Sequence, residues 1–218
     1  MKAIIFDFDG TIANTLPICY YAFQNVFKKF DEKNLSAEDI RAMFGPSETG
    51  IIKENLIHSN KDEAIELYYE KYLEQHKQLV EQNSEMDDLL SFIKAKGLLL
   101  GIVTGKARRS LEISLNALQM DNIFDVIITG DDVIEPKPHP EGIMKALSLL
   151  EVNKEDAMFV GDSEADIVAG VSAGVLTIGV QWLDDYQTGE FNTQPNQIMK
   201  EIKDFKVMLN EWAYKITL

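Results

Sequence analysis

The sequence predicts an α/β protein with a doubly wound, Rossmann-like parallel sheet and a helical cap domain inserted after the first strand. Short apolar runs alternate with segments of helical periodicity over most of the chain, which is typical of parallel sheets covered by helices on both faces. One long stretch after the first run has helical periodicity throughout and exceeds the length of an ordinary crossover. We therefore expect a core domain of residues 1–15 and 83–218 and a cap domain of residues 16–82.

The first strand is expected at residues 3–6, and the cap helices should follow it. Apolar residues recur at helical spacing from residue 18 to 30 and from residue 65 to 79. Between these stretches, Ser36 and Asp39 resemble a capping box that begins another helix. Gly45-Pro46-Ser47 then interrupts the helical pattern, so we expect a loop there.

The rest of the chain predicts four more strands separated by helices. Ser84 and Asp87 are expected to cap a helix that is closed by Gly97. The further strands are expected at residues 98–103, 124–129, 157–160 and 175–180, and the further helices at residues 107–118, 142–150, 165–173 and 195–209.

The charge and cysteine content disfavour two classes of partner and fit a reducing compartment. With 36 acidic and 21 basic residues, the net charge of -15 argues against nucleic acid or an anionic membrane as a partner. Cys19 is the only cysteine, which rules out an intrachain disulfide and fits a reducing compartment. The sequence shows neither a signal-length apolar segment at its start nor a membrane-spanning run. We expect a cytoplasmic monomer or homodimer.

Polar residues stand directly after four of the expected strands. Asp7 and Asp9 follow the first strand, Thr104 follows the second, Lys137 lies in the loop after the third, and Asp162 follows the fourth. In doubly wound sheets, ligands bind at the carboxyl ends of the strands. The sequence therefore places all four signals at one edge of one sheet.

These residue types predict a phosphoryl-transfer site. Several neighbouring carboxylates cannot all ionise without a compensating cation, and oxygen ligands of this kind suit Mg²⁺. Lys137 would add a second positive charge. We predict that Asp7 attacks phosphorus and forms an aspartyl phosphate. Asp9 would protonate the leaving oxygen and then deprotonate water, while Thr104 and Lys137 would stabilise the phosphoryl oxygens.

The predicted site residues follow from these roles. The catalytic residues are Asp7, Asp9, Thr104 and Lys137. The substrate-binding residues are Gly10, Thr11, Thr104 and Gly105. Asp7, Asp9 and Asp162 are the predicted metal ligands, and Asp166 is expected to support the metal shell, with helix capping as its alternative role.

The motifs around these residues resemble those of the haloacid dehalogenase superfamily. They are residues 7–12, Thr104, Lys137-Pro138 and residues 161–166, and their order is similar to that of capped phosphatases, phosphoglycolate phosphatases above all. The resemblance implies that Mg²⁺ binds the Asp7 and Asp162 carboxylates and the Asp9 main-chain carbonyl, and that the cap opens and closes over the substrate. Asn14 and Gly105 depart from the family pattern, and we expect Asn14 to cap a helix.

Several functions stay open at this point. The leading hypothesis is a Mg²⁺-dependent phosphatase for a small phosphorylated metabolite, possibly phosphoglycolate-like. The alternatives are a sugar-phosphate mutase that resembles β-phosphoglucomutase, an inorganic pyrophosphatase, and a non-catalytic phosphate-binding protein, which the intact Asp7, Asp9 and Lys137 disfavour. We also expect Gly45-Pro46-Ser47 to dip toward the site, Arg41 to be a candidate for a substrate carboxylate, and Asp7 to be a surface carboxylate without core packing.

Overall fold

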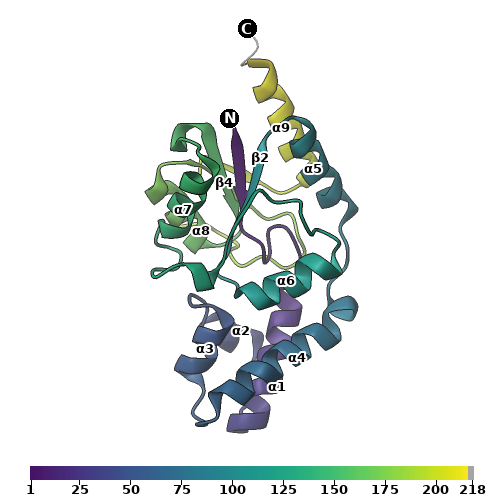
Figure 1. Cartoon of the computed structure of the whole chain (residues 1–218), viewed down its shortest axis with the longest axis vertical. Coiled ribbons are helices and arrows are strands. Elements are labelled where there is room, and N and C mark those ends of the chain that lie inside the picture. Colours follow the sequence, from purple (N-terminus) through teal and green to yellow (C-terminus); the bar gives the residue numbers. More distant parts are fainter. Residues whose placement is uncertain (216–218) are drawn as a thin grey trace.

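A six-stranded parallel sheet forms the core of the protein (Figure 1). The computed structural model describes residues 1–215. The strand order is β3-β2-β1-β4-β5-β6, so the first strand lies in the middle of the sheet. The strands are β1 (Ala3–Phe6), β2 (Leu99–Val103), β3 (Val126–Ile128), β4 (Ala157–Gly161), β5 (Leu176–Val180) and β6 (Gln197–Met199).

Strand β1 shows why the sheet is covered on both faces. All four of its residues are buried, and it pairs in parallel with β2 and β4. Ile4 and Phe6 belong to one hydrophobic cluster, whereas Ile5 belongs to another that contains Ile143. Because alternate side chains of a strand point to opposite faces, the two clusters cover opposite faces of the sheet. This confirms the predicted doubly wound α/β class.

Five helices lie between β1 and β2, which confirms the predicted helical insertion. They are α1 (Leu16–Asp31), α2 (Ala37–Arg41), α3 (Glu48–Asn55), α4 (Lys61–Leu79) and α5 (Ser84–Ala95). Helices α1 to α4, hereafter the cap, lie below the carboxyl ends of the strands, whereas α5 lies beside the sheet next to α9 (Figure 1). The exact boundaries of the two domains stay a prediction.

Aromatic side chains from α1 and α4 fill the interior of the cap. The rings of Phe23 and Tyr68 lie 4.6 Å apart between their centroids, and Tyr68 stacks at 5.9 Å on Tyr72. All three side chains are buried. The aromatic residues at helical spacing in α4 therefore form cap core, as their periodicity predicts.

The remaining helices follow the predicted pattern to within two residues, except at the end of the chain. They are α6 (Arg108–Ala117), α7 (Glu141–Leu150), α8 (Glu164–Ala173) and α9 (Ile202–Lys215), with short 3₁₀ turns at η1 (Gly130–Asp132) and η2 (Lys154–Asp156). Across the described residues, every helix is too short or too polar to cross a membrane.

Three local expectations are wrong. Residues 195–209 are not one helix, because Gln197–Met199 pairs with β5 as an edge strand before α9 begins. The cap of α5 is Asn83 rather than Ser84, because the Asn83 side chain accepts hydrogen bonds from two N–H groups of the first turn. Asn14 does not cap α1, because Thr15 holds the N-cap position and Asn14 Oδ1 accepts no hydrogen bond; the Asn14 amide donates to Asp185 at 3.0 Å. The capping box of Ser36 and Asp39 is confirmed.

Candidate active site

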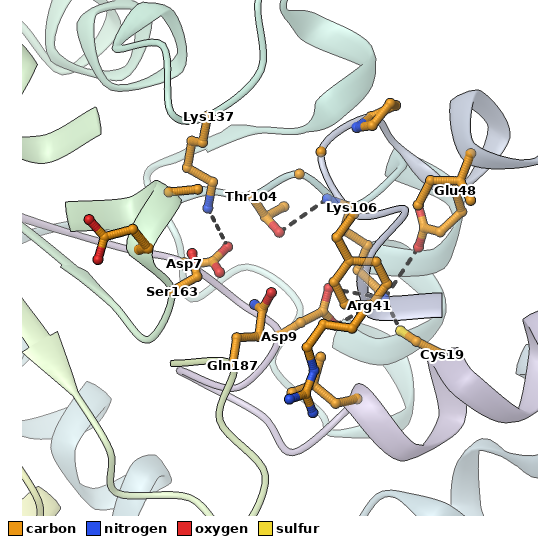
Figure 2. A pocket seen from close by; sticks show the side chains of 18 of the residues that line it. Asp7, Asp9, Cys19, Arg41, Glu48, Thr104, Lys106, Lys137, Ser163 and Gln187 are labelled. Atoms are coloured by element: carbon orange, nitrogen blue, oxygen red, sulfur yellow. Dashed lines mark hydrogen bonds and ion pairs between the residues drawn. The ribbon is translucent and has the colours of Figure 1, made fainter. Parts of the chain in front are cut away.

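The strand-end signals meet at a cavity of about 420 Å³ between the core and the cap (Figure 2). Asp7, Asp9, Thr104 and Lys137 line it from the core. Three strands, β1, β2 and β3, precede these residues, and parallel strands bring their carboxyl ends to one edge. Pro46 lines the cavity from the cap, so the loop at residues 45–47 reaches the site as expected.

Asp7 and Lys137 lie at the centre of the core wall. The Nζ atom of Lys137 lies 2.9 Å from Asp7 Oδ1 and 2.6 Å from Asp166 Oδ1, and it donates to the Val103 carbonyl at 3.2 Å. Asp7 Oδ1 is buried and pairs by charge with Lys137, and no other described group donates to it. Asp7 is only 4% exposed, and the expectation of a surface carboxylate is wrong.

Asp162 is held in place from two directions. The Thr11 hydroxyl donates to Asp162 Oδ1 at 3.0 Å, and the Gln187 N–H donates to Asp162 Oδ2 at 2.7 Å. Gly10 has a φ of 79°, and a Cβ atom there would lie 2.3 Å from Asp162 Oδ2. Only glycine fits both the left-handed backbone and this close approach. The turn after β1 therefore positions the carboxylate that follows β4.

Asp166 has two contacts that explain its burial. Its Oδ2 atom completes a capping box with Ser163 at the start of α8. Its Oδ1 atom accepts from Lys137. The residue therefore caps a helix and orients the lysine at the same time.

The three carboxylates form a cluster that fits a divalent cation. Ligand atoms of Asp7, Asp162 and Asp166 all lie within 4.8 Å of one another, and all three residues are buried. Burial is the largest cause that raises the pKa of Asp7, and the negative charge of Asp166 is the second. The pKa of Asp7 rises from 3.8 to about 7. Burial and the charges of Asp166 and Asp7 also raise the pKa of Asp162 well above its usual range. Lys137 alone leaves excess negative charge, which a hard cation would neutralise.

The lysine remains charged in this setting. Burial lowers the pKa of Lys137, but the Asp166 and Asp7 carboxylates outweigh burial and raise the pKa above its ordinary value. A permanent positive charge thus lies beside the Asp7 carboxylate.

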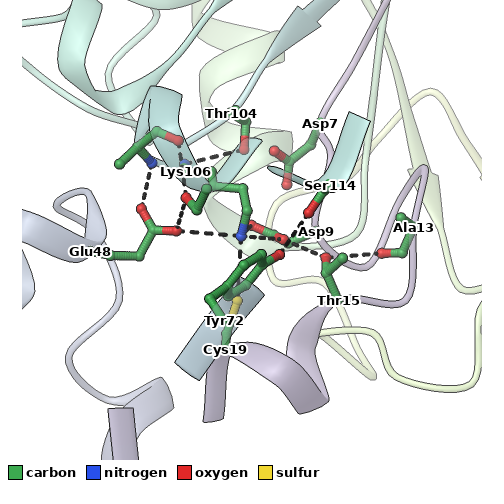
Figure 3. A network of polar contacts seen from close by, with 12 residues as sticks. Asp7, Asp9, Ala13, Thr15, Cys19, Glu48, Tyr72, Thr104, Lys106 and Ser114 are labelled. Atoms are coloured by element: carbon green, nitrogen blue, oxygen red, sulfur yellow. Dashed lines mark hydrogen bonds and ion pairs between the residues drawn. The ribbon is translucent and has the colours of Figure 1, made fainter. Parts of the chain in front are cut away.

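Asp9 belongs to a second group of charges, at the junction with the cap (Figure 3). Lys106 Nζ lies 3.0 Å from Asp9 Oδ1 and 3.3 Å from Glu48 Oε1. The Thr15 hydroxyl also donates to Asp9. Asp9 is therefore fixed by a lysine of the core and by the residue that precedes α1.

Thr104 faces the cavity, whereas Gly10 and Thr11 do not line it. Thr104 Oγ1 accepts from the Lys106 N–H at 3.2 Å, which leaves its hydroxyl proton available to a ligand. Gly105 lines the cavity. The backbone N–H groups of Gly10 and Thr11 donate within the turn, so both residues support the site, and their contact with substrate stays a prediction.

The cap wall carries one positive side chain, Arg41, and one negative side chain, Glu48, among apolar ones. Arg41 lines the cavity and donates to the Tyr20 hydroxyl at 3.0 Å, and Tyr20 stacks on Phe44 at 6.2 Å between the ring centroids. Arg108 and Arg109 instead pair with Asp132 and Glu66 on the surface, as their helical position predicts.

Sequence reasoning missed Lys106 and Glu48. Lys106 follows directly after Thr104-Gly105, so its place beside a strand-end motif was a usable signal. Glu48 lies at the start of α3 in the cap and reaches the core only through the fold. No local pattern indicates that contact.

Comparisons with known proteins agree with the fold and the motifs. The family model described as "Haloacid dehalogenase-like hydrolase" matches residues 4–180. Pyrophosphatase PpaX of Bacillus mycoides is 32% identical to this chain over 210 residues. The aligned residues cover 96% of this chain and 97% of the relative. Pyrophosphatase PpaX of Bacillus cereus is 36% identical over 182 residues, which cover 84% of each chain.

Solved structures share the same architecture. A predicted phosphoglycolate phosphatase from Haemophilus somnus has a TM-score of 0.84 at 23% identity, covering 96% of this chain and 98% of its own. CbbY from Rhodobacter sphaeroides in complex with phosphate has a TM-score of 0.81 at 23% identity. The match covers 94% of this chain and 96% of the CbbY chain. At these identities the likeness shows the fold. With the family model spanning most of its sequence, the chain belongs to the haloacid dehalogenase-like hydrolases.

Proposed function

We propose that the protein is a Mg²⁺-dependent phosphatase that hydrolyses a small phosphorylated compound through an aspartyl phosphate at Asp7. The observation that carries the proposal is the cluster of three buried carboxylates, Asp7, Asp162 and Asp166, beside which the described structure places one lysine, with its Nζ atom 2.9 Å from Asp7 Oδ1. Three neighbouring carboxylates cannot all ionise beside one cation, so the cluster calls for a second positive charge.

The Asp7 and Asp162 carboxylates would hold the metal, together with the Asp9 carbonyl that the family resemblance implies. Bound Mg²⁺ would neutralise the excess negative charge and allow phosphate to approach a carboxylate. Asp166 would act on this site through Lys137, which it contacts directly. Thr11 and the Gln187 N–H keep the Asp162 carboxylate in place.

The chain's own residues supply the reacting groups. An Asp7 oxygen forms a bond to phosphorus as the bond to the leaving oxygen breaks, and Asp9 donates a proton to that oxygen. In the second step water attacks the same phosphorus, Asp9 takes its proton, and Asp7 is released with inorganic phosphate. Lys137 and the Thr104 hydroxyl stabilise the phosphoryl oxygens in both steps.

The cap, proposed as residues 16–82, would close over residues 1–15 and 83–218 and exclude water during phosphoryl transfer. Its wall offers space beyond the phosphoryl site, with Leu16, Phe44 and Arg41 among the lining residues. This composition suits an organic leaving group with an anionic end, in line with the phosphoglycolate-like expectation.

Inorganic pyrophosphate is the second candidate substrate. The similarity to proteins named pyrophosphatase PpaX, at 32% and 36% identity over most of the chain, favours it. Its leaving phosphate would meet Arg41, the one cation on the described cap wall that no carboxylate neutralises. A sugar-phosphate mutase is less favoured, because it must also bind the second phosphate of a bisphosphate. Arg41 alone offers few positive groups on the cap wall for that phosphate.

Phosphate release from a panel of compounds tests the proposal. The panel contains phosphoglycolate, several sugar phosphates and pyrophosphate, each with and without Mg²⁺, and sugar phosphates also with glucose 1,6-bisphosphate. We expect Mg²⁺-dependent release by the wild type and none by Asp7→Asn. Release from pyrophosphate alone would select the second candidate, and isomerisation that requires the bisphosphate would select the mutase. No turnover of any compound would contradict the proposed function.

A further inference from the structure

A buried lysine joins the cap to the proposed acid and base of the reaction. Lys106 lies in the loop between β2 and α6, and its side chain is fully buried. Its Nζ atom contacts Asp9 after β1 and Glu48 at the start of α3 (Figure 3). One ammonium group thus binds a carboxylate of the core and a carboxylate of the cap.

The Glu48 carboxylate is fully engaged by the core. Its Oε2 atom accepts from the Ala107 N–H immediately before α6, and its Oε1 atom accepts from the Ser110 hydroxyl at 2.5 Å. A carboxylate at a helix N-terminus is favoured by the free N–H groups and the helix dipole. Glu48, a residue of the cap domain, therefore binds the N-terminus of α6 in the core. This contact stabilises the position in which the cap domain is closed against the core.

Burial makes this group of charges sensitive to the loss of any member. Glu48 is 5% exposed, and Lys106 Nζ also lies 4.5 Å from the centre of the Tyr72 ring of the cap. Removing one partner of a buried ion pair leaves an uncompensated buried charge. The free-energy cost of that charge exceeds the stabilisation that the intact pair provides. When the cap lifts, Glu48 and Tyr72 leave, and Lys106 keeps only Asp9 and the solvent.

We propose that Lys106 is a positioning residue for Asp9 and that Glu48 makes this positioning depend on the seated cap. The inference rests on the proposed function, in which Asp9 moves the protons. With the cap seated, Lys106 is held between two carboxylates and fixes the Asp9 oxygen at 3.0 Å, so Asp9 faces the cavity in one orientation. With the cap lifted, Lys106 still pairs with Asp9 but is no longer restrained by Glu48, so Asp9 is held less firmly and water reacts more slowly with the aspartyl phosphate.

Burst kinetics with p-nitrophenyl phosphate and Mg²⁺ separate this role from a structural one. The first step releases nitrophenolate, which leaves without a proton, whereas the second step needs Asp9 to activate water. For Lys106→Met we expect a burst of about one nitrophenolate per site, at a rate within about threefold of the wild type, followed by a steady rate lowered about 100-fold, the scale of general acid–base catalysis. Asp9→Asn should show the same pattern.

Glu48→Gln keeps one acceptor oxygen for the Ala107 N–H, and its amide NH2 can donate to the Ser110 hydroxyl oxygen, but the variant loses the charge that holds Lys106. Its steady rate should fall about tenfold, again with the burst retained. The double variant Glu48→Gln/Lys106→Met should be no slower than Lys106→Met, because the two residues act through one contact. It also removes both charges together, so the test stands even if Lys106→Met alone folds poorly.

Glu66→Gln is the matched control. Glu66 of the cap pairs with Arg109 of the core at 2.6 Å, but this cap–core ion pair is exposed and distant from the described cavity lining. Both burst and steady rates should match the wild type. Equal losses in the two phases of Lys106→Met, or no loss in either, would overturn the positioning role. Turnover by Asp7→Asn would instead overturn the proposed function itself, so the two failures can be told apart.

Discussion

The two walls of the cavity are built from opposite kinds of side chain. At the core wall, Asp7 belongs to a cluster of three buried carboxylates, and Lys137, which contacts Asp7 and Asp166, leaves excess negative charge there. The cap wall contributes apolar side chains such as Leu16 and Phe44 together with Arg41 and Glu48. The first arrangement suits a metal and a reacting phosphoryl group, and the second suits a leaving group. The difference indicates that the core determines the chemistry and that the cap selects the substrate.

The walls also differ in what they contribute to stability. Burial raises the pKa of Asp7, so we expect its charged carboxylate at the core wall to destabilise the metal-free protein. Around Tyr72, by contrast, the cap packs aromatic rings and satisfied hydrogen bonds against the core. Buried charged groups with shifted pKa values are commonly concentrated at functional sites. Four predictions test this contrast, in order of decreasing effect.

The largest effect should come from Asp7→Asn on the core wall. We expect turnover to fall at least about 10⁴-fold, because the variant has no nucleophile. Without metal, its stability should equal or exceed that of the wild type, since a buried charge is removed. Phosphate release and chemical denaturation measure the two quantities. Asp121→Asn, at an exposed position, is the control and should change neither. Strong destabilisation by Asp7→Asn would contradict our account of the core wall.

Metal removal should reveal a pH dependence of stability. Asp7 has a pKa of about 7 when folded against 3.8 as its ordinary value, so the folded state binds its proton more tightly. Without Mg²⁺, the free energy of unfolding should therefore fall by a few kcal/mol as the pH rises from about 4 to about 7. Added Mg²⁺ should stabilise the protein more at pH 8 than at pH 5.

Thermal unfolding in chelator at several pH values, with and without Mg²⁺, measures this dependence. Asp7→Asn is the matched control, because the variant lacks the titrating group and should show a flatter profile. Identical profiles for the wild type and the variant would mean that Asp7 carries no strained charge in the folded protein.

A smaller effect is expected from Arg41→Ala on the cap wall. We predict a roughly tenfold rise in KM for a substrate whose leaving group is anionic, about 1.4 kcal/mol of binding, with kcat changed little. For an aryl phosphate with an uncharged leaving group, KM should stay the same. Steady-state kinetics on the pair of substrates decide the point. An equal rise for both would assign Arg41 to the phosphoryl group instead.

The smallest effect should come from Tyr72→Phe. The buried Tyr72 hydroxyl lies 2.8 Å from Ser114 Oγ, and this contact joins α4 of the cap to α6 of the core. Loss of the hydrogen bond should cost about 1 kcal/mol in the free energy of unfolding. Tyr21→Phe, at a half-buried position of α1, should change it by less than about 0.5 kcal/mol. Equal effects of the two variants would mean that the cap–core hydrogen bond does not stabilise the fold.

The core wall was predictable from the sequence, and the cap wall largely was not. Asp7, Thr104, Lys137 and Asp162 follow apolar strands, and parallel topology brings such positions together without knowledge of loop geometry. The contact between Glu48 and Lys106 joins two domains, and no periodicity encodes it.

Local chemistry explains the other differences. Gln197–Met199 is a three-residue edge strand, too short for an alternating pattern, so it was included in a helix. Asp7 was expected at the surface because a strand end usually is, but it is buried at a cavity that residues of both the core and the cap line. Such burial depends on how the helices pack, which the sequence pattern alone does not give.

The most direct test of the central claim is to find the phosphoryl group on Asp7. Protein is quenched in acid during turnover with Mg²⁺ and digested. The masses of its peptides are measured by mass spectrometry with and without hydroxylamine, which cleaves acyl phosphates. We predict one hydroxylamine-sensitive phosphate on the peptide that contains Asp7, enriched in Asp9→Asn and absent from Asp7→Asn. Steady turnover with no phosphate on that peptide in Asp9→Asn, or with phosphate on another residue, would contradict the account.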